Sequence, residues 1–258
     1  MNTLLLHFDD ERAPAERLAS ACALPCACIE RHRFPDDELR LRLPVDANSA
    51  LPEQVVLYRS LDRPNDKLIE LMLVARQARE LGARRVLLVA PYLAYMRQDI
   101  AFHPGEVVSQ RVIGRFLAEL FEALITVDPH LHRVASLAEA VPLAHAISLS
   151  GAPMLARLIA QRHERPLLIG PDAESAQWIE AAAKEHNFDH GVCSKVRHGD
   201  RQVEIALPPL DVKGRAVVVL DDVASSGHTL AAAARLLLAA GAASVDVGVS
   251  RDKARNST

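Results

Sequence analysis

Short apolar runs alternate with longer amphipathic segments along most of the chain. The runs are rich in Val, Leu and Ile and are apolar on both faces, which is typical of strands buried in a parallel sheet. The longer segments repeat apolar residues at helical spacing. This alternation predicts an α/β fold of mostly parallel sheets flanked by helices. Strands are expected at residues 55–58, 85–90, 123–127, 166–169, 216–220 and 244–250, and helices at residues 65–81, 107–122, 151–162, 175–187 and 229–240.

Two segments depart from this alternation. Residues 31–44 alternate apolar with charged side chains, which favours an exposed strand. Residues 191–207 are polar with alternating apolar positions, which favours a hairpin or a mobile arm.

The chain divides into two similar halves, since each contains a buried strand followed by an aspartate. These aspartates are Asp128 in the first half and Asp221 and Asp222 in the second. A length of 258 residues is sufficient for two modest α/β domains. We therefore expect a first domain over residues 1–146 and a second over residues 147–258.

Composition and charge exclude several classes of protein. The net charge of −3 gives no electrostatic reason to expect nucleic acid or an anionic membrane as the main partner. The sequence contains no run of about 18 uncharged apolar residues, so no membrane span is expected. The apolar stretch at the start is too short, and the residues after it are too acidic, for a signal peptide.

Three of the four cysteines, Cys22, Cys26 and Cys28, are clustered, and Cys193 stands alone. A metal site from the cluster is an alternative, although the spacing lacks a second Cys or His pair. Free thiols in a reducing compartment are the favoured interpretation, and a cytoplasmic protein is expected.

The most specific chemical signal lies in residues 217–229, where a buried strand leads into a polar loop and an alanine-rich helix. The first N–H groups of that helix lie at the positive end of its dipole, and Gly227 allows the backbone to approach a ligand closely. The loop therefore predicts a binding site for a phosphate dianion. Asp221 and Asp222 are expected to accept from sugar hydroxyls or to help hold Mg²⁺. A plain helix N-cap explains one or two of these residues, but not the whole run.

This run resembles the 5-phosphoribosyl 1-pyrophosphate (PRPP) loop shared by type I phosphoribosyltransferases and PRPP synthetases. Three further segments, residues 33–38, 90–106 and 125–132, resemble PRPP synthetases in particular. Their order and spacing match from about residue 30 to residue 250. The resemblance implies two phosphoribosyltransferase-like domains and the transfer of the pyrophosphoryl group of ATP to ribose 5-phosphate.

The resemblance also implies roles for individual residues. In this family the early loop serves the site of a neighbouring subunit, which implies a homo-oligomer, a dimer or a hexamer, with sites at subunit interfaces. Mg²⁺ is the implied cofactor, with His130 and Asp172 at metal positions. The implied ATP-binding residues are Phe34, Asp36, Glu38, Arg97, Gln98 and Asp99. The implied ribose 5-phosphate-binding residues are Asp221, Asp222, Ala224, Ser225, Ser226, Gly227, His228 and Thr229.

Lys195 and Arg197 match the catalytic Lys-x-Arg pair of the family. Transfer of a phosphoryl group depends on positioning and on cations that stabilise the developing charge, rather than on covalent chemistry. Two cations on an arm that closes over the site would supply that charge and exclude water. An ordinary basic hairpin is the alternative for these two residues alone.

Three features depart from the family pattern. Ile100 stands where a basic residue usually follows the aspartate at position 99, and His228 stands where Gly or Ala is more frequent. Related synthetases add a strand and a helix after the strand expected at residues 244–250, where this sequence has a polar tail. The second domain is therefore expected to be short at its end, as a short variant, a truncated chain or a chain completed by another subunit.

Other functions remain open from the sequence. A non-catalytic homologue that regulates an active synthetase would bind nucleotide without turnover. A phosphoribosyltransferase would consume PRPP, release pyrophosphate and need no ATP. A kinase-like enzyme acting on another phosphorylated pentose would retain the same phosphate loop.

Overall fold

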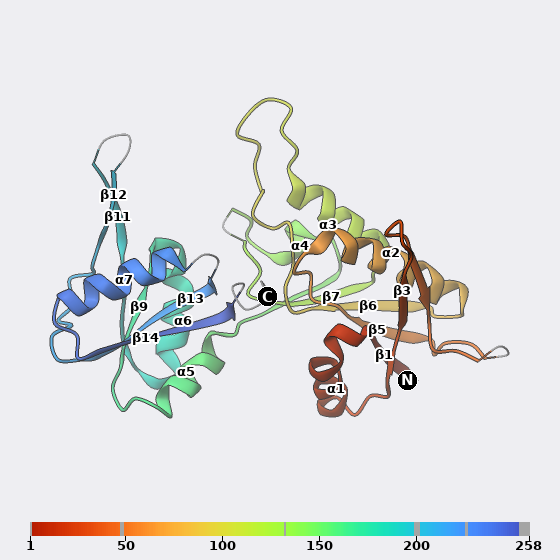
Figure 1. Ribbon diagram of the computed structural model, residues 1–258, viewed down its shortest axis with the longest axis horizontal. Helices are drawn as coiled ribbons and strands as arrows, with labels where there is room; N and C mark the ends of the chain where they lie inside the picture. Colours follow the sequence, from red (N-terminus) through yellow and green to blue (C-terminus); the bar gives the residue numbers. More distant parts are fainter. Residues whose placement is uncertain (1, 47–48, 132, 199–201, 225–226, 253–258) are drawn as a thin grey trace. The chain divides into compact units, whose positions relative to one another are not determined.

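A computed structural model describes residues 2–46, 49–131, 133–198, 202–224 and 227–252 (Figure 1). Within these ranges only the backbone is described for residues 195–198, 202–204, 222–224 and 251–252. The chain divides into two compact units, unit 1 (Met1–Leu149) and unit 2 (Ser150–Thr258). The boundary between the units follows residue 149, three residues after the boundary expected from the sequence.

Unit 1 is built on a six-stranded sheet in the order β2-β1-β5-β6-β7-β8, in which every neighbouring pair is parallel. Three of these strands, β1, β2 and β8, were not expected from the sequence. The strand β2 has only three residues, and β8 at the sheet edge is largely exposed, so neither has the apolar run of a buried strand. The strands are β1 (Thr3–His7), β2 (Cys26–Cys28), β5 (Gln54–Tyr58), β6 (Arg85–Ala90), β7 (Ala123–Val127) and β8 (His145–Leu149).

Helices cover both faces of this sheet, with α2 and α3 on one side and α1 on the other (Figure 1). The alternation of side chains along each strand decides which residues face which helices. Leu57 packs toward α2 and α3, whereas its neighbour Val56 packs against α1. The helical elements are η1 (Asp9–Glu11), α1 (Arg12–Ala21), α2 (Pro64–Glu80), α3 (Ser109–Leu120) and α4 (Leu137–Ala140).

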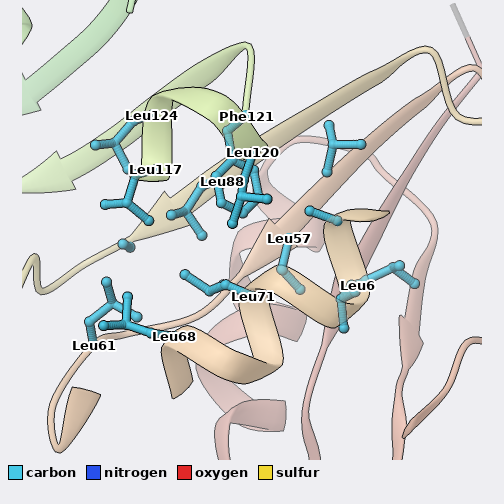
Figure 2. Close-up of a cluster of buried hydrophobic side chains, with 14 of the residues drawn as sticks. Leu6, Leu57, Leu61, Leu68, Leu71, Leu88, Leu117, Leu120, Phe121 and Leu124 are labelled. Atoms are coloured by element: carbon cyan, nitrogen blue, oxygen red, sulfur yellow. The ribbon is translucent and has the colours of Figure 1, made fainter. Parts of the chain in front are cut away.

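Leucine is the most frequent residue in the main core of unit 1, followed by alanine and valine, as the low aromatic content of the sequence implies (Figure 2). Leu57 and Leu88 come from the sheet, Leu71 from α2 and Leu117 from α3, and all are at most 1% exposed. Complete burial of such a side chain stabilises the fold by about 1.5–3 kcal/mol. This core makes unit 1 a rigid support for the loops at the carboxyl ends of its strands.

Residues 31–44, expected as one exposed strand, form most of an antiparallel hairpin of β3 (Glu30–Arg33) and β4 (Leu39–Arg42). The hairpin is a separate two-stranded sheet beside the main sheet. Its base is anchored by Ile29 and Leu43, which are buried in the unit 1 core. The alternation of apolar and charged residues follows from one face packing inward and the other facing solvent.

Unit 2 contains a smaller parallel sheet in the order β10-β9-β13-β14. The strand β13 was expected to end at Leu220, but it continues through Ala224 because its last residues remain paired with β14. The strands are β9 (Leu167–Gly170), β10 (Asp189–Val192), β13 (Ala216–Ala224) and β14 (Ser244–Asp252).

Different helices cover the two faces of the unit 2 sheet. Leu168 and Val218 pack against α5 and α6, whereas the adjacent Leu167 and Val217 pack against α7. Because helices cover both faces of the sheet, its strands must be apolar on both faces, as the sequence indicated. The helical elements are α5 (Ala152–Ala160), η2 (Ala173–Ser175), α6 (Ala176–His186) and α7 (His228–Ala239).

The polar segment at residues 191–207 contains an antiparallel hairpin of β11 (Ser194–His198) and β12 (Gln202–Ala206), which projects from the unit 2 sheet (Figure 1). This hairpin was one of the two forms expected. In the part of the chain that the structure describes, no helix is both long and apolar enough to cross a membrane.

The four cysteines are free thiols that differ in exposure. Cys22 is exposed, whereas burial raises the pKa of Cys26, Cys28 and Cys193, the last of which is fully buried. Because the thiolate is the reactive form, we expect iodoacetamide at about pH 8 to modify Cys22 first and Cys193 last. Peptide mass spectrometry over a time course measures this order. Early modification of Cys193 in the native protein would contradict it.

Candidate active site

The tip of the β3–β4 hairpin carries Phe34, Asp36 and Glu38 on a tight turn. The N–H of Phe34 donates to the carbonyl of Glu38 at 2.8 Å, and Asp37 takes a left-handed φ of 69°. Phe34 is 39% exposed, and its ring lies edge-on to that of His32, with 4.9 Å between ring centroids. Asp36 and Glu38 are also exposed. The tip therefore offers a ligand one aromatic face and several hydrogen-bond acceptors.

In the loop that follows β6, Arg97 is exposed and Gln98 is half-buried. The side-chain amide of Gln98 donates to Glu106 at 3.0 Å. Glu106 also accepts from the N–H of Phe102 at 2.6 Å and of His103 at 3.0 Å, and these backbone hydrogen bonds lower its pKa. A carboxylate with these partners holds the loop after Arg97 in a defined conformation.

Asp99, which the resemblance assigns to ATP, points into the protein. Its side chain is 2% exposed, and Oδ1 accepts from Nη1 of Arg133 at 2.8 Å. Among the described residues, Oδ2 has no hydrogen-bond partner. The Arg133 side chain is 53% exposed, so the pair presents a cation, rather than a carboxylate, to solvent. Sequence reasoning missed Arg133 because nothing in a pattern links residues 34 positions apart.

The end of β7 carries Asp128 and His130. Asp128 has a left-handed φ of 41°, and its N–H donates to the carbonyl of Leu149 on the neighbouring strand β8 at 2.9 Å. His130 is half-buried, and His132 lies outside the described residues. Since β6 and β7 are parallel neighbours, the loops with Arg97 and His130 leave the same edge of the sheet.

Asp172 follows β9 in unit 2 and caps the short helix η2. Its Oδ1 accepts from the N–H of Glu174 at 3.1 Å, and its carbonyl accepts from the hydroxyl of Ser175 at 2.6 Å. These contacts fix the carboxylate at the carboxyl edge of the unit 2 sheet, where α/β proteins bind ligands.

Gly227 is the residue before α7 and has a left-handed φ of 75°. A Cβ placed there would meet no atom of the described residues within 4 Å, and the left-handed backbone angle by itself favours glycine. His228 begins the helix outside the left-handed region, so this departure from the family pattern causes no backbone strain. Thr229 follows in the first turn of α7. The first N–H groups of α7 therefore begin directly after a glycine turn, as the sequence predicted.

The residues before this turn are described in part. Asp221 is half-buried on β13. Only the backbone of Asp222 and Ala224 is described, on the same strand, and Ser225 and Ser226 lie outside the described residues.

Lys195 and Arg197 lie on β11, where only their backbone is described. They pair with Ile205 and Val203 of β12. Positions 195 and 197 are two residues apart on one strand, so they belong to the same face of the hairpin.

The loops at the carboxyl ends of the strands supply the candidate donors for Mg²⁺. Within the described residues, no group of three or more His, Cys, Asp or Glu side chains is arranged to hold a metal ion by itself. Mg²⁺ bound with a nucleotide takes most of its oxygens from phosphates and water and needs only one or two protein donors. Asp128 and His130, which follow β7 in unit 1, fit this smaller requirement. Asp172, which follows β9 in unit 2, fits it for a separate ion.

Comparison with known proteins identifies the family. A model of the N-terminal domain of ribose phosphate pyrophosphokinase matches residues 3–121, and a phosphoribosyl transferase domain model matches residues 147–257. A ribose-phosphate pyrophosphokinase of Saccharolobus solfataricus is 34% identical over 236 residues, covering 89% of this chain and 78% of that protein. The chain belongs to the ribose-phosphate pyrophosphokinase family. A second member, from Methanopyrus kandleri, is 36% identical over 229 residues, covering 88% of this chain and 76% of that protein.

The fold agrees with this family. A crystal structure of phosphoribosylpyrophosphate synthetase from Mycobacterium smegmatis aligns with a TM-score of 0.79 at 19% identity, over 98% of this chain and 82% of that one. The predicted family, the α/β class with phosphoribosyltransferase-like domains and the pyrophosphokinase type of enzyme are therefore confirmed. The roles assigned to single residues stay predictions.

Proposed function

We propose that this chain transfers the pyrophosphoryl group of ATP to the 1-hydroxyl of ribose 5-phosphate, giving PRPP and AMP. The observation that carries the proposal is the left-handed Gly227 between β13 and α7, in a chain of the pyrophosphokinase family. This turn leaves the start of α7 open to a phosphate dianion, which ribose 5-phosphate supplies.

In this proposal the nucleotide is held by residues of unit 1, with the tip of the β3–β4 hairpin supplied by a neighbouring subunit of a homo-oligomer. The exposed ring of Phe34 stacks on the adenine, and Asp36 and Glu38 accept from its exocyclic amine. Arg97, exposed at the carboxyl edge of the sheet, contacts the phosphates, and Gln98 orders the backbone beside it.

The sugar phosphate is held by unit 2. The N–H groups that follow Gly227, with the hydroxyl of Thr229, bind the 5-phosphate. The carboxylates of Asp221 and Asp222 accept from the 2- and 3-hydroxyls. Ser225 and Ser226 are assigned to the phosphate from the sequence.

The transfer forms one bond and breaks one. The 1-hydroxyl oxygen attacks the β-phosphorus of ATP, and the bond from that phosphorus to the oxygen bridging to the α-phosphate breaks. AMP leaves with the bridging oxygen and the electron pair of that bond, and the hydroxyl proton passes to solvent. Lys195 and Arg197 stabilise the charge that develops on the transferring group and on AMP.

We assign the cofactor as Mg²⁺. Asp128 and His130 of unit 1 would hold one ion at the nucleotide phosphates, and Asp172 of unit 2 would hold a second ion at the sugar, through donors that need only supplement the substrate oxygens. When bound, the ion at the nucleotide neutralises phosphate charge and thereby favours attack on phosphorus.

The test is incubation of the pure protein with ATP, Mg²⁺ and ribose 5-phosphate, with AMP and PRPP followed by chromatography. We expect both products in equal amounts. Binding of ATP without AMP formation would overturn the proposal and favour a regulatory homologue. Release of pyrophosphate from PRPP and a nucleobase, without ATP, would favour a phosphoribosyltransferase.

Replacement of Phe34 by Ala tests the nucleotide end of the proposal. Loss of one aromatic stacking face costs about 0.5–1.5 kcal/mol, so we expect KM for ATP to rise by up to about tenfold. KM for ribose 5-phosphate should not change. Steady-state kinetics with each substrate varied in turn measures both. An unchanged KM for ATP would show that the hairpin tip does not contact the nucleotide.

A further inference from the structure

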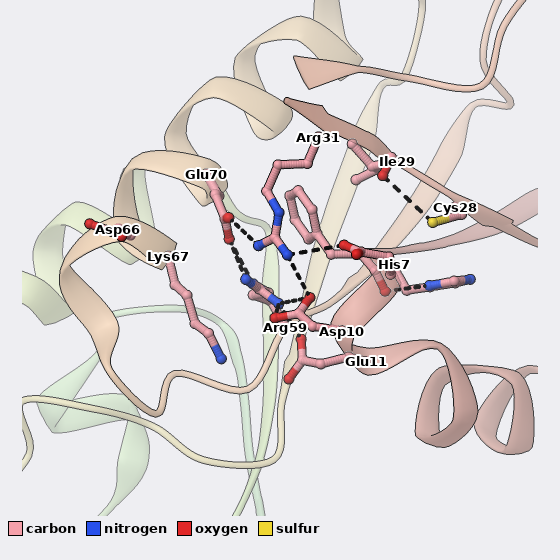
Figure 3. Close-up of polar contacts among 12 residues, drawn as sticks. His7, Asp10, Glu11, Cys28, Ile29, Arg31, Arg59, Asp66, Lys67 and Glu70 are labelled. Carbon is pink, nitrogen blue, oxygen red and sulfur yellow. Dashed lines mark hydrogen bonds and ion pairs between the residues drawn. The ribbon is translucent and has the colours of Figure 1, made fainter. Parts of the chain in front are cut away.

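A cluster of charged side chains lies beneath the β3–β4 hairpin, at the carboxyl ends of β1 and β5 (Figure 3). This charge cluster comprises residues from four different segments of unit 1. Its members are Asp9, Asp10, Glu11, Arg31, Arg59 and Glu70.

Arg59 forms the buried centre of the cluster. Its side chain and that of Glu70 are each 1% exposed, with 2.6 Å between Nη2 and Oε2. Nη1 donates to Asp10 at 2.8 Å and to Glu11 at 2.9 Å. The guanidinium also lies 4.5 Å from the centre of the Phe8 ring. With three carboxylate partners and an aromatic face, Arg59 has one defined position.

Arg31 joins the hairpin to this fixed centre. It lies on β3, and its Nη1 donates to Oε1 of Glu70 at 2.7 Å. Its Nη2 donates to Asp9 at 3.0 Å and lies 3.4 Å from Asp10. Glu70 therefore bridges the two arginines, one oxygen to each, and the position of Arg59 determines the position of Arg31.

A second contact lies closer to the tip. Nη2 of Arg33 donates to Asp66 of α2 at 2.8 Å. This pair is exposed, with side-chain exposures of 41% and 66%, and exposed pairs contribute about 0–1 kcal/mol. The partly buried contacts of Arg31 are the stronger connection between hairpin and body.

The hairpin needs such a connection because two strands alone are marginally stable in water. Its apolar anchors, Ile29 and Leu43, lie at its base and leave the tip at residues 34–38 exposed. A buried ion pair adds little net stability compared with an apolar pair, but it holds its members in a specific geometry. The cluster is thus suited to fixing the direction of the hairpin.

We propose that Arg31, held by Glu70, is a positioning residue that sets the direction in which the hairpin presents Phe34 to the adenine of ATP. The inference rests on the proposed function. Arg31 itself touches no substrate, and its effect on nucleotide binding passes through the hairpin.

The test is Arg31→Met, which keeps the aliphatic length of the side chain and removes its hydrogen bonds. We expect KM for ATP to rise about fivefold as the tip loses its fixed position, with kcat at saturating ATP and KM for ribose 5-phosphate unchanged. The matched control is Arg42→Met on the same hairpin, which removes only an exposed pair with Glu30 at 3.4 Å. This control should leave KM for ATP unchanged.

Combination with Phe34→Ala separates positioning from a general loss of stability. In the Phe34→Ala background, Arg31→Met should add almost nothing to KM for ATP, because the group being positioned has been removed. A merely structural contact would add its full effect in both backgrounds and would overturn the proposal. A normal KM in Arg31→Met, with a raised KM in Phe34→Ala, would overturn it while leaving the proposed function intact.

Arg31→Lys provides a second test if Arg31→Met does not fold. Lysine retains the charge but loses the fork that reaches Glu70 and Asp9 together, so KM for ATP should lie between the values of wild type and Arg31→Met. A wild-type KM in Arg31→Lys would show that charge alone, and not position, matters.

Discussion

Replacing Lys195 by Ala is expected to lower kcat for PRPP formation about 10³-fold, the scale observed when one group that stabilises transition-state charge is removed. The reason is that charge moves onto the transferring phosphoryl group and the leaving AMP, and phosphoryl transfer relies on cations at those positions. Binding of ATP should persist, because the proposed nucleotide contacts lie in unit 1. Quenched-flow or steady-state assays of AMP, together with equilibrium binding of ATP, measure the two effects separately.

A matched control for Lys195→Ala is Lys184→Ala. Lys184 is an exposed lysine on α6 of the same unit. Its removal changes the net charge by the same amount and should leave kcat unchanged. If Lys195→Ala retained wild-type kcat, the β11–β12 hairpin would have no catalytic role, and the ordinary basic hairpin considered from the sequence would be the correct interpretation.

Replacing Arg59 by Met is expected to lower the free energy of unfolding by about 3–5 kcal/mol, the cost of leaving buried charges without their partner. Glu70 and Glu11 both lose a contact below 3 Å, and burial already raises the pKa of Glu11 despite the nearby guanidinium. Urea unfolding measures the loss. Tyrosine fluorescence is a suitable signal for unit 1, because all three tyrosines, Tyr58, Tyr92 and Tyr95, belong to it.

Arg76→Met on the exposed face of α2 is the control for Arg59→Met. Surface changes of this kind usually alter stability by less than about 0.5 kcal/mol. Neutralising Glu70 as well, in Arg59→Met with Glu70→Gln, should recover part of the loss, because a neutral amide costs less to bury than a carboxylate. A loss below about 1 kcal/mol in Arg59→Met would show that the charge cluster relaxes around the missing side chain.

The periodic part of the fold was accessible from the sequence. The strand at residues 123–127 and the helices around residues 65–81 and 229–240 were placed within about two residues, the usual uncertainty of an element boundary. Strands that are buried on both faces have continuous apolar runs in the sequence, and helices have apolar residues with a period of 3.6. Both patterns can be recognised within a short stretch of sequence. The edge strand β8 left no such run, because its side chains are largely exposed.

The phosphate-binding turn was also accessible, because its determinants are consecutive. A buried strand, Gly227 and a helix follow each other within 13 residues, and the left-handed angle at Gly227 is a property of that one residue. The reaction came from the resemblance of four such local segments to one family, which the comparisons then confirmed.

The tertiary structure alone decided which distant charges meet. The ion pair of Arg59 with Asp10 joins residues 49 positions apart, and that of Arg133 with Asp99 joins residues 34 positions apart. No local sequence pattern predicts either pair. Burial is likewise set by the whole fold. The resemblance assigned Asp99 to ATP, and only the tertiary structure shows that this residue is 5% exposed and paired with Arg133. The physical reason is that periodicity and backbone angles are local, whereas desolvation and ion pairing depend on every segment packed around a group.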